Sequence, residues 1–231
     1  MVPSAVAAGG AAAYSSAVLA SSPTHFYRFN SLATDETDFS GNGNDNTPPN
    51  GGSESTFKTD GPTGTYLEMA GYSDGYDVGY SVNPNAFSCE VIVRPSESAI
   101  VDYWGGNDSG GGSTRPWIGR VASDGEVTAY ANNQAGPVFT TSGVDVRDGA
   151  WHQIVFTHNW TSGETSIFVD GAVTNIDASA GSTSKQLNSV MTVGSKKPGN
   201  SMWQGGIAEW SFYESELSAA DVLTHFNASG I

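Results

Sequence analysis

The sequence predicts an all-β fold, either a sandwich or a barrel of short antiparallel strands. Its 231 residues include 29 glycines, 11% aromatic residues and only 14% charged residues. This composition suits short strands joined by tight turns, and outside an Ala-rich start it lacks the residues that long helices favour. Short apolar runs recur between Gly, Asn and Asp turns, with no long helical pattern that would indicate βαβ units. The length suits one large all-β domain or two small ones.

Residues 1–22 are expected to form an arm and a short helix that precede the main domain at 23–231. Residues 1–10 are small and suggest a loose arm, whereas AAAYSSAVLA at 11–20 suits a helix. Pro23 prevents this helix from continuing. Residues three and four apart lie together on a helix, so one face would carry Tyr14, Ala17 and Val18.

The strand candidates follow at short intervals. The first, HFYRFN at 25–30, precedes a loop at 38–52 that is dense in Gly, Asn and Pro. The others are runs of apolar, aromatic and β-branched residues at 66–69, 76–82, 87–95, 100–104, 117–122, 127–131, 137–141, 151–159, 165–170, 190–195 and 205–214. Regular short strands of this kind favour a sandwich or a barrel over an α/β fold.

The clearest hairpin is DGAWHQIVFTHNWTSGETSIFVDG at 148–171. On its first strand Trp151 and Val155 fall on one face, and Ile154 and Phe156 fall on the other. Both faces are apolar, as expected for a central strand that is covered on both sides.

The carboxyl-terminal segment SELSAADVLTHFNASGI predicts a second short helix. Ser218 followed by Asp221 is a typical helix start, and Gly230 is a typical stop. The apolar stripe of this helix would consist of Val222, Leu223 and Phe226. We expect the helix to fold back on the strands.

The charge excludes two classes of partner. The chain has 24 acidic and 9 basic residues, a net charge of -15. Nucleic acids and anionic membranes need Lys and Arg, so neither is expected as a partner.

The single cysteine, Cys89, excludes an intrachain disulfide and should be a buried thiol. The start has no basic residues ahead of its apolar part, and no stretch is long enough to span a bilayer.

Several segments, in the right order, resemble the laminin-G-like, concanavalin-A-like jelly-roll family. The segments are SPTHFYRFN with DFSGNGND, then DGAWHQIVFTHN and IFVDG, and finally VGSKKPGNSMWQGGIAEWSFYESELSAADVLTHFNA. Together they cover most of the chain from about residue 14 to the end. The resemblance implies a sandwich of two curved antiparallel sheets, with the short helices predicted above at either end.

The same resemblance implies a calcium site. Family calcium sites use oxygens of the Asp-x-Ser-Gly-Asn loop together with acids of the closing strand, which here correspond to Asp38, Asn42 and Glu209. Ala208 stands where many relatives have a further acid. Ca²⁺ is therefore the one cofactor to consider. The alternative is that Asp38, Ser40 and Asn42 stabilise a turn through bonds to the backbone.

The segment AAAYSSAVLASSPTHFYRFN at 11–30 is similar to the lead-in of jelly-roll domains in tailed-phage virion proteins. The similarity implies a virion protein assembled in the host cytoplasm. Its partners would be other virion subunits or further copies of the chain.

A Gly-rich loop offers the best candidate for ligand binding. It is YWGGNDSGGGSTRPW at 103–117, where Trp104 and Trp117 bracket Asn107 and Asp108. Sugar sites combine an aromatic face with a few fixed polar groups. The alternative is that these aromatics cover loop bases or lie in subunit contacts, where Trp is also enriched.

Catalysis is not expected. Glycoside hydrolases need two carboxylates about 5–9 Å apart in one cleft. Glu214 and Glu216 have the right alternation, but they lie where the closing strand runs into the final helix. His152 has apolar neighbours and no nucleophile beside it, so it should be a packed, hydrogen-bonded histidine.

The sequence therefore favours a non-enzymatic virion protein of a tailed phage, on the capsid or the tail, that attaches to surfaces and recognises glycans. The alternative is a free carbohydrate-binding module or lectin of bacterial origin, Ca²⁺-dependent and extracellular.

Overall fold

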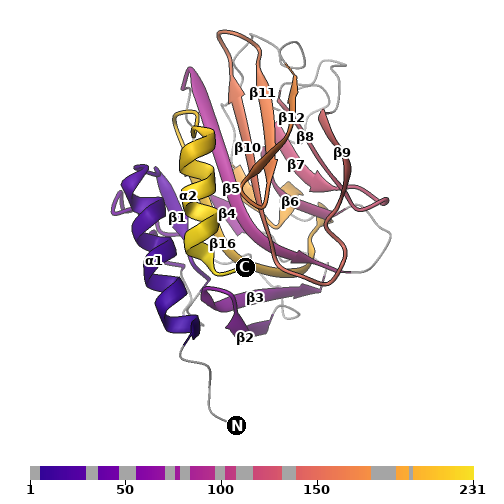
Figure 1. Cartoon of the computed structure of the whole chain (residues 1–231). Helices are drawn as coiled ribbons and strands as arrows, with labels where there is room; N and C mark the ends of the chain where they lie inside the picture. The colour runs from indigo at the N-terminus through magenta and orange to yellow at the C-terminus, as the bar shows by residue number, and fades with distance from the viewer. Residues whose placement is uncertain are drawn as a thin grey trace.

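Two antiparallel sheets pack face to face, and two helices lie side by side on the outer face of the larger sheet (Figure 1). This is the sandwich that the sequence predicted. The structure, a computed structural model, describes residues 6–29, 36–46, 56–70, 76–78, 84–96, 102–107, 117–131, 139–177, 191–197 and 200–231. None of the helices within these ranges is long and apolar enough to cross a membrane.

The larger sheet has eight strands. Across the sheet their order is β12 (Ala172–Asp177), β11 (Thr165–Val169), β10 (His152–Asn159), β5 (Ala86–Pro95), β16 (Gln204–Tyr213), β3 (Gly64–Ala70) and β2 (Thr56–Gly61), and β1 (His25–Tyr27) also pairs with β16. The smaller sheet has six strands, in the order β4 (Tyr76–Val78), β13 (Met191–Val193), β6 (Asp102–Asn107), β7 (Trp117–Val121), β8 (Glu126–Ala131) and β9 (Phe139–Asp145). A separate pair consists of β14 (Ser195–Lys197) and β15 (Asn200–Met202).

Each predicted strand contains or overlaps a strand of the structure, but four strands were missed. These are β2, β12, β14 and β15. The exposed and half-buried residues of β2 and β12 explain the omission, because strands at a sheet edge need no apolar alternation. The predicted strand at 25–30 was too long, since Phe29 adopts a left-handed backbone conformation with φ 46°.

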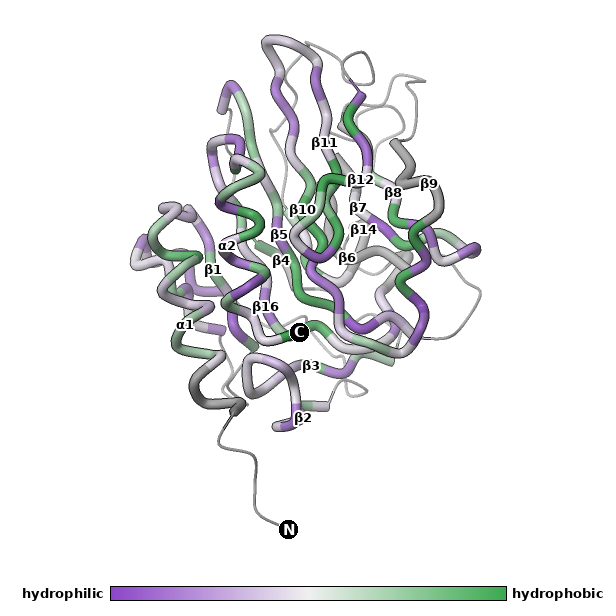
Figure 2. The backbone as a smooth tube through the Cα atoms, in the orientation of Figure 1, coloured by the Kyte–Doolittle hydropathy of each residue, from purple (hydrophilic) through white to green (hydrophobic). Residues whose placement is uncertain are grey.

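The hairpin of β10 and β11 is confirmed. Ile154 pairs with Val169 and Phe156 with Ile167, and all four lie in the core between the sheets. The alternate pair, Val155 and Phe168, lies in a second core beneath the helices. Figure 2 shows the hydrophobic colour along these strands. The two faces of β10 therefore serve two different cores, which is why both are apolar.

The amino-terminal helix α1 (Val6–Ala20) begins earlier than predicted. Residues 6–10 are helical, so the prediction of a loose arm was wrong for them. Tyr14 and Val18 are fully buried on one face, as expected, and they join the core beneath the helices. The helix therefore packs on the same domain as the strands that follow it.

The carboxyl-terminal helix α2 (Ala219–Ser229) has the predicted ends. Ser218 and Asp221 form a reciprocal capping box, and Gly230 ends the helix at φ 77°. The predicted stripe was partly wrong, because Leu223 is 47% exposed. Val222 of the stripe is buried, together with His225 and Ser229, which the stripe did not include. The burial of His225 is explained by its ion pair with Glu90.

Candidate functional site

The predicted sugar-binding residues converge on one pair of strands. Trp104 and Asn107 belong to β6 and Trp117 belongs to β7, whereas Asp108 lies outside the described residues. The register sets Asn107 directly opposite Trp117. Trp104 lies at a register shift between Tyr103 and Gly105. Asn107 and Trp117 are therefore neighbours on the six-stranded sheet, and Trp104 lies three residues from Asn107 on the same strand.

An arginine that the sequence reasoning missed lies on the same strand pair. Arg120 is opposite Tyr103 in the register, and its Nε donates to Oγ1 of Thr128 at 2.8 Å. Val121 and Val127, the next residues along each strand, are buried in the core between the sheets. Alternation therefore puts Arg120 and Thr128 on the outer face of the smaller sheet. The alternation around Arg120 was the signal that could have found it.

Asp38, a predicted calcium ligand, stabilises its own loop. Its Oδ1 accepts the backbone N–H groups of Phe26 and Ser40, at 3.0 and 2.9 Å. Its Oδ2 accepts the hydroxyl of Ser40 at 2.8 Å and the backbone N–H of Asn44 at 3.1 Å. Asn42 donates its amide to the carbonyl oxygens of residues 23 and 24. These bonds are the ones expected from a turn stabilised by its side chains.

Glu209, the third predicted ligand, is buried on β16 beside Arg28. Its Oε1 is 3.4 Å from Nε of Arg28, and its Oε2 has no hydrogen-bond partner among the described residues. Burial raises the pKa of Glu209 to about 8, although the charge of Arg28 opposes the shift. In the described part of the chain, no three acidic, His or Cys residues are grouped to hold a metal ion. Asp38 and Asn42 thus bond within their own loop and Glu209 lies beside Arg28, and the shared Ca²⁺ site stays a prediction.

A buried carboxylate organises the face beneath the helices. Glu90 of β5 is fully buried, and its Oε1 accepts the hydroxyl of Tyr14 at 3.0 Å and the amide of Gln153 at 2.7 Å. Its Oε2 accepts the hydroxyl of Tyr213 at 3.0 Å and lies 2.8 Å from Nδ1 of His225. One side chain therefore joins α1, α2 and three strands, because Tyr14 belongs to α1 and His225 to α2.

The ionisation of this pair follows from its contacts. Burial works against the charge of Glu90, but the hydrogen bond and charge of His225 lower the pKa of Glu90 overall. Burial likewise opposes the charge of His225, and Glu90 outweighs it and raises the pKa of His225. The lowered pKa of Glu90 and the raised pKa of His225 both favour the charged forms, so the two side chains form a buried ion pair.

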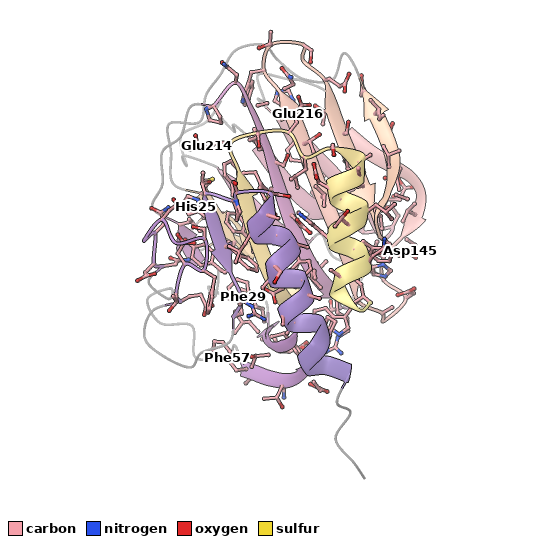
Figure 3. The ribbon with its side chains drawn as sticks, turned by 60° about the vertical axis from the view of Figure 1, so that its left-hand side comes forward. His25, Phe29, Phe57, Asp145, Glu214 and Glu216 are labelled. Carbon is pink, nitrogen blue, oxygen red and sulfur yellow. The ribbon has the colours of Figure 1, made fainter. Side chains whose placement is uncertain are left out.

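The contacts of His225 argue against a serine-hydrolase triad at this histidine. Oγ of Ser21 is 3.0 Å from Nε2 of His225, so Ser21, His225 and Glu90 have the order of a hydrolase triad. The raised pKa of His225 favours the protonated ring, which cannot accept the proton of a serine nucleophile. Glu214 and Glu216 are exposed on the link between β16 and α2 (Figure 3).

His152 is a packed, hydrogen-bonded histidine, as predicted. Its Nδ1 is 2.8 Å from Oδ2 of Asp170, and its Nε2 is 3.0 Å from Oδ1 of Asp148. Burial opposes its charge, but both acids raise its pKa. The ring of His152 therefore links the segment before β10 to the segment after β11.

Solved structures of several other proteins share this fold. The binding domain of Paraclostridial Mosquitocidal Protein 1 aligns at a TM-score of 0.70 and 15% identity, over 90% of this chain and 52% of that chain. Domain 4 of AbnA, an extracellular arabinanase from Geobacillus stearothermophilus solved with arabinotriose, aligns at 0.68 and 16%, over 88% and 97%. Botulinum neurotoxin type C, whose cell entry depends on two ganglioside molecules, aligns at 0.66 and 12%, over 93% and 53%.

The chain spans about half the length of the mosquitocidal and botulinum structures. At these identities the likeness shows the fold alone, and no curated protein sequence matches. The family is shown by a sequence model, Laminin_G_3, described as the concanavalin A-like lectin/glucanases superfamily, which matches residues 70–223. Because this match covers more than half of the sequence, the chain belongs to the Laminin_G_3 family of the concanavalin A-like lectin/glucanases superfamily.

Proposed function

We propose that the chain is a non-catalytic glycan-binding module and that its sugar-binding surface lies at the β6–β7 strand pair. The observation that carries the proposal is the register, which sets Asn107 opposite Trp117 and leaves Trp104 three residues away on the same strand. Aromatic rings beside a few fixed polar groups are the usual composition of a sugar site.

Two solved relatives support the ligand class. One is an arabinanase domain in complex with arabinotriose, and the other is a neurotoxin that uses ganglioside molecules for cell entry. The acids support a role without catalysis, since Glu216 accepts the amide of Asn159 at 2.6 Å and is exposed on the link between β16 and α2.

A glycan array probed with the purified full chain tests the proposal. We expect binding to a restricted set of glycans, and Trp104→Ala and Trp117→Ala should each weaken that binding by about tenfold, the loss typical of an aromatic anchor. Phe39→Ala is the matched control, because Phe39 is an exposed aromatic on the distant loop at 36–46. An array without any bound glycan, or equal losses in all three variants, would contradict the proposal.

We infer a virion setting as a second proposal, on the capsid or the tail of a tailed phage. It rests on the similarity of residues 11–30 to the lead-in of such proteins. Immunogold labelling of phage particles with antibody against the chain tests it, with dense and regular labelling expected. A free extracellular lectin would instead leave particles unlabelled and would bind its glycan in an EDTA-sensitive way.

A further inference from the structure

Four side chains, one buried and three half-buried, form a cluster on the outer face of the eight-stranded sheet, opposite the face that meets the smaller sheet. This cluster, called the Arg94 cluster, consists of Arg94, Trp151, Tyr66 and Glu68. Nη2 of Arg94 donates to the hydroxyl of Tyr66 at 2.8 Å and to Oε2 of Glu68 at 3.0 Å. The guanidinium carbon lies 5.0 Å from the ring centroid of Trp151 and 5.2 Å from that of Tyr66.

A glycine explains how the cluster is built. Gly206 of β16 lies between Arg94 and Glu68 in the register, paired with one on each side. The indole of Trp151 covers this glycine so closely that a Cβ there would lie 2.5 Å from the ring. The ring of Tyr66 meets the indole edge to face, with centroids 4.9 Å apart. An aromatic floor therefore lies between a cation and an anion that are fixed on neighbouring strands.

Within the described part of the chain, the polar groups of the cluster keep unused bonding capacity. An arginine has five N–H donors, and the bonds of Arg94 to described residues involve Nη2 alone. Towards these same residues Glu68 uses only Oε2, which leaves Oε1 as an acceptor. The side chains of Arg94 and Glu68 are 32% and 35% exposed, so these groups face water. Ordered donors and acceptors beside an indole ring are pre-organised for a ligand, which lowers the entropy cost of binding.

We propose that the Arg94 cluster is a second glycan site, which takes a neutral sugar through two adjacent hydroxyl groups and needs no metal ion. One hydroxyl oxygen accepts an N–H of Arg94, and the neighbouring hydroxyl donates to Oε1 of Glu68. The C–H face of the sugar ring packs on the exposed part of Trp151. The site lies on the other sheet from the β6–β7 pair, so it does not depend on that proposal.

Charge selects the neutral class of sugar. Arg94 and Glu68 offset each other, so the cluster has no net charge to attract an ionic ligand. The chain as a whole carries a net charge of -15, which repels sialylated and uronic-acid glycans. The guanidinium binds a hydroxyl oxygen by donating hydrogen bonds, which needs no metal ion.

The test measures binding of the full chain to neutral and sialylated oligosaccharides in the presence of EDTA. We expect a neutral glycan to bind. Arg94→Lys keeps the charge but loses the planar fork, and Glu68→Gln keeps the size but loses the charge, so each should weaken binding by about tenfold. Glu164→Gln, a matched change at a half-buried glutamate in the β10–β11 turn, should leave binding unchanged.

A second readout locates the ligand on the protein. The indole N–H resonance of Trp151, assigned by its absence in Trp151→Phe, should shift when the neutral glycan is added. Melting temperatures of all variants verify that they are folded. The proposal is overturned if no neutral glycan binds, if EDTA abolishes binding, or if folded Arg94→Lys and Glu68→Gln bind as the unaltered chain does. A glycan that binds without moving the Trp151 resonance also overturns it.

Discussion

The substitution Glu90→Gln should destabilise the whole domain, because this one carboxylate accepts four buried groups. They belong to Tyr14, Gln153, Tyr213 and His225. A glutamine has one acceptor oxygen in place of two. Its NH2 group would face two of the neighbouring donors, which would then have no acceptor. Breaking a buried ion pair in this way costs about 3–5 kcal/mol. In a chain of 231 residues that loss lowers the melting temperature by roughly 6–20 °C.

The effect should depend on pH in a defined direction. The pKa of His225 is raised from its ordinary value of 6.5, so its contribution is complete below 6.5 and is lost as pH rises through the raised value. The pKa of Glu90 is lowered from 4.5, so its contribution is complete above 4.5 and is lost as pH falls through the lowered value. The difference in unfolding free energy between the unaltered chain and Glu90→Gln should therefore be largest between pH 4.5 and 6.5.

Urea unfolding followed by circular dichroism across this pH range provides the measurement. Tyr14→Phe is the graded control, since it removes one donor and should cost about 1–3 kcal/mol. The double variant Glu90→Gln/His225→Gln should cost less than the sum of the two single changes, because the pair is coupled. A Glu90→Gln chain within about 1 kcal/mol of the unaltered chain at pH 5.5 would refute the view that this network holds the helices on the sheet.

Three further predictions concern other parts of the molecule. Gly206→Ala should lower the melting temperature by several degrees and expose Trp151, since a Cβ would lie 2.5 Å from the indole. The exposure should appear as a red shift in tryptophan fluorescence, and an unchanged spectrum would contradict this packing. As pH rises from 4.5 to about 8, the free energy of unfolding of Glu209→Gln should rise by a few kcal/mol relative to that of the unaltered chain. Burial raises the pKa of Glu209, so the unaltered folded chain must either keep the proton of Glu209 or bury its charge. Parallel curves of stability against pH for the two chains would argue against this. Ca²⁺ should leave the melting temperature unchanged, since Asp38 already accepts four donors, and a rise of several degrees that EDTA reverses would show that the ion displaces them.

Local sequence patterns predicted the central strands and the two ends of α2. The β10–β11 hairpin was predictable because alternate residues on a strand point to opposite faces, so apolar residues on both faces require cover on both sides. The start of α2 was predictable because Ser218 and Asp221 satisfy backbone groups within the same turn. The polar edge strands β2 and β12 carry no such pattern and were missed.

One candidate site could be predicted from the sequence and the other could not. Trp104, Asn107 and Trp117 could be proposed together because a short Gly-rich segment joins them along the chain. The Arg94 cluster could not, since its four residues come from three separate segments and only the register of β16 with β3 and β5 aligns them.

The sequence by itself determined the all-β class, the strongly apolar strands, the capped helix and an acidic surface that disfavours nucleic acid. Tertiary structure alone decided that Glu90 would meet Tyr14 across 76 positions and His225 across 135 positions of the chain. It also decided that Gly206 would separate Arg94 from Glu68. The physical reason is range: alternation and capping act between residues a few positions apart, whereas strand register depends on the packing of all strands at once.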